Sequence, residues 1–173
     1  MSTFPVPKDV RGTRNFEPVR GMDEFIRESL PIADEAANFD PGEWVKRVTS
    51  AGITKAGKLA TGVDTLAAPA LGAKVCWTSY RPNNSDLGQS DALATKTVDL
   101  LSGSYQAKTK LYNTGSGVLA PGNLLVAVFD GTQDGGILDV VDPSSATIRQ
   151  LQAVVGRIIE VANGQLHYEA PAI

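Results

Sequence analysis

The dipeptide Asn163-Gly164 constrains the fold of this chain more than any other feature, because it stands between two runs of strand-forming residues. Asn-Gly favours a two-residue type I′ turn with positive φ at both positions, and such a turn fixes the pairing of the flanking strands. The predicted pairs are Ala162–Gln165, Val161–Leu166, Glu160–His167 and Ile159–Tyr168. One face of this hairpin then carries Ile159, Val161, Leu166 and Tyr168. The sequence therefore predicts an antiparallel sheet with one buried face and one face in water.

Composition bounds the class of protein. The chain has 173 residues and a formal net charge of −3, so its charge balance gives no indication of a nucleic-acid partner. Its 17 glycines and 10 prolines, with an aromatic fraction of only 6%, favour a turn-rich β protein over a helical bundle. A chain of this length can bury about 70% of its unfolded surface, so it needs no disulfide or metal to build a core.

The single cysteine cannot form an internal disulfide, which fits a protein assembled in a reducing compartment such as the cytosol. Cys76 stands between Val75 and Trp77 and is expected to be a small buried residue. Because no run of eighteen apolar residues is present, the sequence predicts no transmembrane helix and no membrane partner. The first seven residues also lack the apolar core of a signal peptide.

Residues 1–42 are predicted to form an extended N-terminal arm that contains one short helix. The helix is expected at about 22–30, where apolar residues follow a helical spacing. Its apolar face is formed by Met22, Phe25, Ile26 and Leu30. Pro31 would end the helix, because the residue before a proline is pushed out of the α region.

Residues 43–173 are predicted to form an antiparallel β-domain, either as one body or with 43–100 as a separate lobe. Short strand-like runs recur between turn residues, at the spacing typical of a sandwich or barrel. Before the final hairpin, these runs are 43–49, 53–55, 73–81, 93–101, 104–113, 124–129 and 137–141. The pattern predicts that 93–101 and 104–113 form a strand pair around Ser102-Gly103. The predicted fold is mainly β: a small antiparallel sandwich or barrel with an extended N-terminal arm and one short helix.

Residues able to do chemistry are few. His167 is the only histidine, and a cross-strand polar pair with Glu160 accounts for it. A histidine-based triad would also need a positioned nucleophile, and the chain has no Gly-x-Ser-x-Gly turn. One histidine and one cysteine cannot supply a four-ligand zinc site. The sequence therefore predicts no enzymatic activity, no catalytic residue, no cofactor and no metal centre.

Two further motifs are weak. Residues 130–135 begin like a calcium-binding loop, but the twelfth position holds Val141 in place of glutamate. Turn chemistry explains the Asp-Gly pairs better, and a weak ion site at Asp130 and Asp134 stays open. Asn83-Asn84-Ser85 matches a glycosylation sequon, but nothing else in the chain indicates secretion.

Trp44 and Trp77 fall within strand-like runs and are expected to anchor the core, because each can bury a large area there. The alternative is an exposed aromatic platform for a glycan or a host receptor. On that alternative, Trp44 and Tyr80 would be the binding residues.

The C-terminal part carries a buried strand introduced by a glycine and a closing strand pair. In residues 119–125, Gly122 precedes the apolar run, and the closing pair spans 152–160 and 163–168 with Val155-Gly156-Arg157 at its centre. With these features, residues 105–170 resemble the head decoration (cement) proteins of tailed bacteriophages. The resemblance implies a non-enzymatic virion protein on the outer capsid surface, assembled in the host cytoplasm, that bridges and stabilises major capsid subunits. It also implies self-association, with a homotrimer favoured over a homodimer.

The resemblance gives the N-terminal arm a role in binding the capsid. The candidate contacts are its aromatic and basic residues, Phe4, Lys8, Arg11, Arg14, Phe16 and Arg20. An arm that orders on a partner gains a long contact surface, and repetition on a lattice multiplies the effect. The alternatives are another phage structural component, such as a tail or baseplate adaptor, and a small β-barrel hydrolase that uses Asp130 or Asp134.

Overall fold

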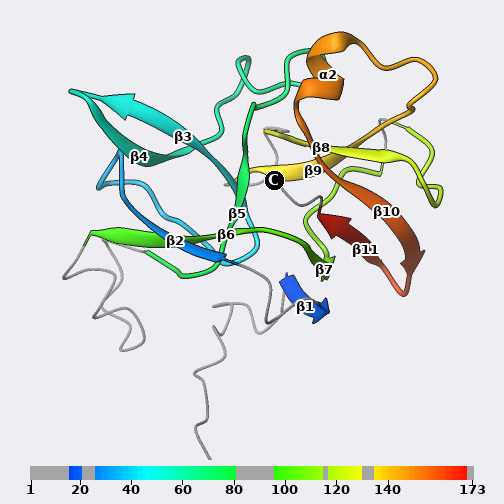
Figure 1. The fold of residues 1–173 in the computed structure, drawn as a ribbon, viewed down its shortest axis with the longest axis horizontal. Helices are drawn as coiled ribbons and strands as arrows, with labels where there is room; N and C mark the ends of the chain where they lie inside the picture. The colour runs from blue at the N-terminus through cyan, green and yellow to red at the C-terminus, as the bar shows by residue number, and fades with distance from the viewer. Residues whose placement is uncertain (1–15, 21–25, 81–95, 115–116, 130–134, 171–173) are drawn as a thin grey trace, which may run out of the picture.

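The computed structural model describes residues 16–20, 26–80, 96–114, 117–129 and 135–170. Within them the chain folds into two antiparallel β-sheets, which form a sandwich, and one short helix, α2 (Ile148–Gln152). Figure 1 shows the five-stranded sheet on the left and the six-stranded sheet on the right. The prediction of a mainly β sandwich is confirmed.

The six-stranded sheet holds the C-terminal half of the chain. Its strands, in spatial order, are β1 (Phe16–Arg20), β7 (Tyr105–Thr109), β11 (Gln165–Ala170), β10 (Val154–Ala162), β8 (Leu124–Val128) and β9 (Ile137–Val141). The buried strand predicted at 124–129 and the strand predicted at 137–141 are confirmed as β8 and β9. Both strands are covered on both faces, which explains why β8 is a continuous apolar run and why β9 is apolar except at the buried Asp139.

The five-stranded sheet curls until it nearly closes on itself. Its strands, in spatial order, are β2 (Ile26–Pro31), β6 (Thr97–Ser102), β5 (Lys74–Cys76), β3 (Trp44–Ser50) and β4 (Ile53–Lys58). Just after β2, Ile32 forms a β-bridge with Ala56 of β4, and the Ala33 amide donates to the Ala56 carbonyl at 2.9 Å. The two outer strands of this sheet therefore meet, and the sheet encloses side chains of its own.

Two apolar cores result from this arrangement. The inter-sheet core lies between the two sheets and includes Trp44, Leu101, Leu125 and Tyr168. The inner core lies inside the curled sheet, where all five strands contribute. Its members are Leu30, Ile32, Phe39, Val45, Ala56, Cys76, Tyr80, Val98 and Leu100. Strand β5 lies between the cores, because Val75 belongs to the first and Cys76 to the second.

The predicted closing hairpin is confirmed as β10–β11, with φ of 52° at Asn163 and 71° at Gly164. The first three predicted pairs are present, but the fourth is wrong, because Tyr168 pairs with Ile158 in place of Ile159. An irregularity between Ile158 and Glu160 shifts the register by one residue. Ile158 is therefore the buried core residue, and Ile159 is half-buried.

The helix predicted at about 22–30 is wrong over its described part. Residues 26–31 form β2, which pairs with β6 from Ile26–Ser102 to Pro31–Thr97. The helical spacing involved only a few apolar residues, and a neighbouring strand offers backbone hydrogen bonds that an isolated short helix lacks. The first residues of that prediction, 22–25, lie outside the described part of the chain.

Two other strand predictions are wrong in part. The runs around Ser102-Gly103 do form strands, β6 and β7, but the two belong to different sheets and do not pair. The run predicted at 73–81 is a strand only over Lys74–Cys76. Residues 43–100 contribute four strands of one sheet, but this sheet shares the inter-sheet core with the rest of the chain.

Candidate binding surface

The described part of the chain contains neither a cluster of possible metal ligands nor a helix that could cross a membrane. Over residues 16–20, 26–80, 96–114, 117–129 and 135–170, no three His, Cys, Asp or Glu side chains lie together as a metal site would require. Over the same ranges, no helix is long and apolar enough to cross a membrane.

His167 lies opposite Glu160 on the hairpin, as predicted, with Nδ1 3.5 Å from Oε1. Its Nε2 atom is buried and has no hydrogen-bond partner among the described residues. Arg157 lies on the same outer face of the hairpin, where its Nε donates to Glu169 at 2.9 Å. These contacts are those of a polar outer sheet face.

The aromatic platform proposed as an alternative is wrong for its two named residues. Trp44 and Tyr80 are both buried, Trp44 in the inter-sheet core and Tyr80 in the inner core. Trp77 packs against the inter-sheet core and is partly exposed beneath the guanidinium of Arg27, which lies 5.5 Å from its ring centroid. The two tryptophans therefore anchor the core, as predicted.

Cys76 is buried, as its neighbours predicted, and its Sγ donates to the carbonyl of Thr78 at 3.0 Å. Burial raises the pKa of this thiol well above its ordinary value, chiefly because an ionised thiolate would be desolvated. The residue is therefore a packing element of the inner core and not a nucleophile.

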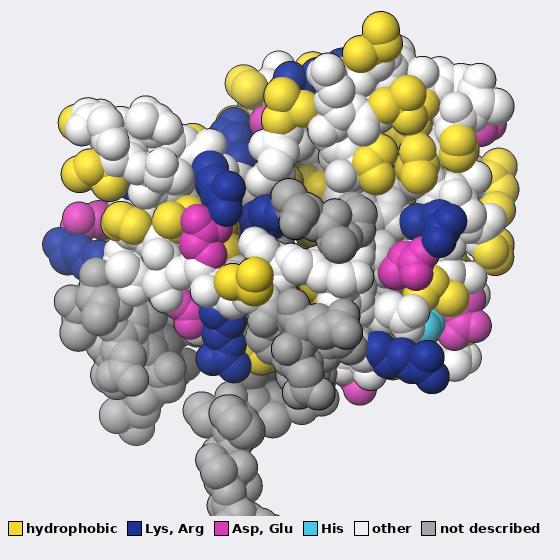
Figure 2. All heavy atoms as spheres, in the orientation of Figure 1, with side chains coloured by type: hydrophobic (Ala, Val, Ile, Leu, Met, Phe, Trp, Pro, Cys, Tyr) yellow, Lys and Arg dark blue, Asp and Glu magenta, His cyan; other side chains and the backbone are white. Residues whose placement is uncertain are grey.

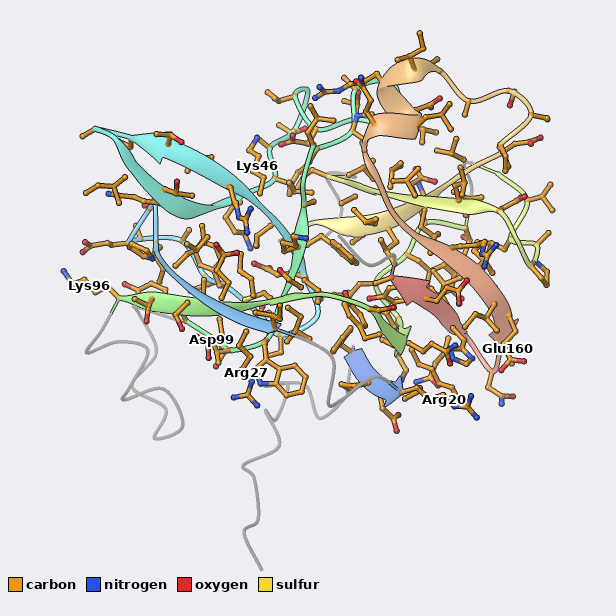
Figure 3. The ribbon with its side chains drawn as sticks, in the orientation of Figure 1. Arg20, Arg27, Lys46, Lys96, Asp99 and Glu160 are labelled. Carbon is orange, nitrogen blue, oxygen red and sulfur yellow. The ribbon has the colours of Figure 1, made fainter. Side chains whose placement is uncertain are left out.

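The structure brings part of the predicted arm onto the folded body. Phe16 and Arg20 belong to β1, which pairs with β7, and the Phe16 ring makes edge contacts with Trp77 and Tyr105. Arg20 is the last residue of β1 and lies at the lower edge of the molecule in Figure 3. Several other candidates lie outside the described residues: Phe4, Lys8, Arg11, Arg14, Asp130, Asp134 and the sequon at 83–85.

A cleft of about 260 Å³ opens between the two sheets at the start of β5. The five-stranded sheet and the connections at its end supply Trp44, Gly72, Ala73, Lys74, Ser102 and Gly103. The six-stranded sheet and the end of α2 supply Tyr105, Gln152, Val154, Val155 and Ala170. Lys74 is the only charged residue of this lining, which also includes Ser102 and Gln152, so the cleft is lined by both apolar and polar groups.

Exposed apolar side chains stand beside this cleft. Leu71 precedes the cleft residue Gly72 and is 45% exposed, and Leu151 precedes the cleft residue Gln152 and is 48% exposed. Ile148, one helical turn before Leu151, is 77% exposed. Figure 2 shows apolar side chains gathered over α2 and the adjoining edge of the molecule. We call Leu71, Ile148 and Leu151 the apolar rim.

The helix that presents this rim is held in place without burying any of its own residues. Thr147 and Gln150 form a reciprocal capping box at its N-terminus. The side-chain amide of Gln150 also donates to the Leu66 carbonyl at 2.9 Å, which ties α2 to the connection between β4 and β5. Ile148 and Leu151, three residues apart, therefore share one outward face of an anchored helix.

Two ion pairs hold the first half of the same connection. Lys46 Nζ lies 2.6 Å from Asp64, which also accepts from the Ala60 amide at 2.8 Å. Lys58 Nζ lies 2.6 Å from Glu43, a buried carboxylate whose other oxygen has no partner among the described residues. Burial raises the pKa of Glu43 to about 7, although Lys58 opposes the change. These pairs anchor the start of the connection that later carries Leu71.

Sequence reasoning missed the apolar rim. The spacing Thr147-x-x-Gln150 before apolar residues is a capping-box signature and could have located α2. Nothing local to Ile148 or Leu151 indicates that their side chains face water, because exposure depends on what the rest of the fold places against the helix.

Comparison with protein-family models gives no match, and comparison with curated proteins gives none either.

Proposed function

We propose that this chain is a virion structural protein that binds the outer surface of a capsid shell and reinforces it, without enzymatic activity. The observation that carries the proposal is the apolar rim, an outward apolar face on an anchored helix beside the cleft between the sheets. The capsid as partner comes from the resemblance of residues 105–170 to phage head decoration proteins.

The rim supports a binding role because exposed apolar area is a source of association free energy. Burial of apolar surface contributes about 25 cal/mol per Å², and full burial of a Leu or Ile side chain about 1.5–3 kcal/mol. A rim of three such side chains gives modest affinity at a single site. Repeated copies on a lattice raise the effective affinity through multivalency, and self-association, with a homotrimer favoured over a homodimer, would do the same.

The experiment is co-sedimentation with empty shells of the virus that encodes the chain. We expect the double variant Ile148→Ser/Leu151→Ser to bind at least about tenfold more weakly, which corresponds to about 1.4 kcal/mol. Val118→Ser is the matched control, since Val118 is 75% exposed but lies outside the rim and the cleft lining. If the wild type does not bind shells, or if the double variant binds as the control does, the proposal is wrong.

The N-terminal arm is proposed as a second contact. The residues before β1 include Lys8, Arg11 and Arg14, so this stretch is basic in a chain that is acidic overall. Deletion of residues 1–15 leaves β1 intact, and we expect it to weaken shell binding without changing the unfolding midpoint. An arm-deleted protein that saturates shells at the same concentration would remove the arm from the proposal.

A further inference from the structure

Lys74 is buried at the mouth of the curled five-stranded sheet. It pairs with Val45 in the register, and Cys76 lies two residues further on, so its side chain lies on the face that carries the inner core. The residue is only 6% exposed, so its apolar stem is buried, while its ammonium reaches the surface at the mouth. Among the described residues its ammonium makes no hydrogen bond or ion pair.

The neighbouring charges cannot neutralise Lys74, because they already neutralise each other. Arg47 of β3 and Glu28 of β2 form an ion pair, although these strands are not neighbours in the sheet. The pair therefore spans the mouth. Burial lowers the pKa of Lys74, Arg47 adds to this effect and Glu28 opposes it, so all three groups act on one another. Two cations and one carboxylate leave a net charge of +1 at the mouth.

The surroundings favour a small anionic group from a partner surface. Ser102 of β6 pairs with Ile26 of β2 near Lys74, and Ile26 is 65% exposed. The mouth therefore has one exposed apolar side chain at its edge. Figure 2 shows basic and acidic side chains close together over the five-stranded sheet. One negative charge would balance the net charge of +1 at the mouth, whereas a doubly charged phosphate would leave one negative charge in excess beside Glu28. A carboxylate is therefore the better complement.

We propose that Lys74 and Arg47 form a carboxylate-binding site that receives an acidic side chain of the capsid subunit. This inference rests on the proposed function, and it names the chemistry of the partner at a second place on the molecule. The incoming carboxylate accepts hydrogen bonds from Lys74 Nζ and from the Arg47 guanidinium, and Ile26 packs against the apolar part of the same partner residue.

The test uses the full chain, with Lys74→Met as the variant and Lys110→Met as the matched control. Lys110 is exposed, so both variants lose one positive charge but only Lys74→Met loses the amine at the mouth. Lys74→Met should fold with an unchanged or raised unfolding midpoint, because methionine fills the apolar surroundings of the lysine stem and removes a charge that has no partner among the described residues. In shell co-sedimentation we expect at least about a tenfold loss for Lys74→Met and less than about twofold for Lys110→Met.

A second readout does not depend on shells. Acetate, inorganic phosphate and chloride are titrated at equal ionic strength while the backbone amide resonances of Lys74 and Ser102 are followed by NMR. We expect acetate to shift these resonances in the wild type and in Lys110→Met, and to shift the Ser102 resonance in Lys74→Met no more than chloride does. A larger response to phosphate than to acetate would overturn the assignment of a carboxylate.

The outcomes separate this inference from the proposed function. If the wild type binds shells but Lys74→Met binds equally well, the inference is wrong and the proposed function stands. If acetate responds as expected but no form of the protein binds shells, the proposed function is wrong, and with it the identity of the partner. If acetate and chloride act alike on the wild type, the anion site itself is refuted.

Discussion

The inter-sheet core and the inner core enclose apolar side chains in different ways. The inter-sheet core is a layer between two sheets, and the strands facing it bury apolar and aromatic residues such as Leu125 and Tyr168. The inner core is enclosed by one curled sheet, and ionic groups lie next to it. Glu43 and Lys58 form a buried pair, with the Lys58 ammonium 5.3 Å from the Phe39 ring centroid, and Lys74 lies near Arg47 and Glu28.

The difference shows that a curled sheet can enclose apolar side chains only over a short length of each strand. A strand that continues past an enclosed core must place its next inward side chain where water begins, so a long side chain with a charged end suits that position. Lys58 and Lys74 both occupy such positions, at the end of β4 and the start of β5. Lys58 has a buried carboxylate partner and Lys74 has none among the described residues, which is why only Lys74 suggests a ligand site.

The largest expected effect tests the backbone bridge between Trp44 and Gly136, which joins the two sheets. The Trp44 amide donates to the Gly136 carbonyl at 2.9 Å, so the sheets are hydrogen-bonded directly at this bridge. A Cβ at position 136 would overlap the Trp44 carbonyl oxygen and lie 2.6 Å from Leu59 Cδ1. Gly136→Ala should therefore lower the free energy of unfolding by about 4 kcal/mol or more in denaturant titration.

Gly117→Ala is the control for that change. Its Cβ would come no closer than 3.4 Å to the Val140 carbonyl oxygen, an ordinary contact. A Gly136→Ala protein as stable as Gly117→Ala would show that the two sheets are not held rigidly at the bridge.

The next effect compares the two cores directly. Leu125 and Leu100 are both fully buried, one in each core, and truncation of either to alanine should cost about 3 kcal/mol. Because the sheets share the inter-sheet core, both variants should unfold in a single transition, followed by tryptophan fluorescence and far-UV circular dichroism. A separate early transition in Leu100→Ala alone would mean that the five-stranded sheet is an independent lobe.

The third effect depends on pH. The pKa of Glu43 is raised from 4.5 to about 7 by burial, so the folded chain holds this proton more tightly than the unfolded chain. The stabilisation from this group is complete below pH 4.5 and is lost as the pH rises to about 7. Relative to Glu43→Gln, the wild type should lose up to about 3 kcal/mol of unfolding free energy over that range.

Denaturant titrations across this pH range provide the measurement. Glu17→Gln, at an exposed position of β1, should follow the wild-type profile. A flat difference between wild type and Glu43→Gln would mean that Glu43 is ionised in the folded protein throughout.

The smallest expected effect lies on the outer face of the six-stranded sheet. Arg157 and Glu169 form a solvent-exposed ion pair, with 60% and 34% of their side chains exposed. Arg157→Ala should change the unfolding free energy by less than about 1 kcal/mol, and high salt should reduce the difference further. A loss comparable to that of Leu125→Ala would contradict the view that this face is only solvated.

Much of the six-stranded sheet was predictable because its signals are local. The Asn163-Gly164 turn and the apolar run of β8 each carry their meaning within a few residues. The bulge near Ile159 was not predictable, since an extra residue in a strand leaves no mark on side-chain type. Phe16 was assigned to a free arm, because its partners Trp77 and Tyr105 are more than sixty residues away.

The candidate surfaces were less predictable than the fold. Leu71, Ile148 and Leu151 are ordinary apolar residues in the sequence, and Lys74 is one lysine among sixteen basic residues. What distinguishes them is exposure for the first three and burial for the fourth, and both properties arise from segments distant in the chain.

Residue patterns of short range decided that this chain builds antiparallel strands, where it turns, and that Cys76 and the tryptophans stay inside. Only the packing of distant segments decided that β6 and β7 part into different sheets, that β2 is a strand and not a helix, and that one sheet curls onto itself through Ile32 and Ala56. The reason is physical. Backbone geometry and side-chain periodicity act over a few residues, whereas burial and strand pairing are settled by partners that meet only when the chain has folded.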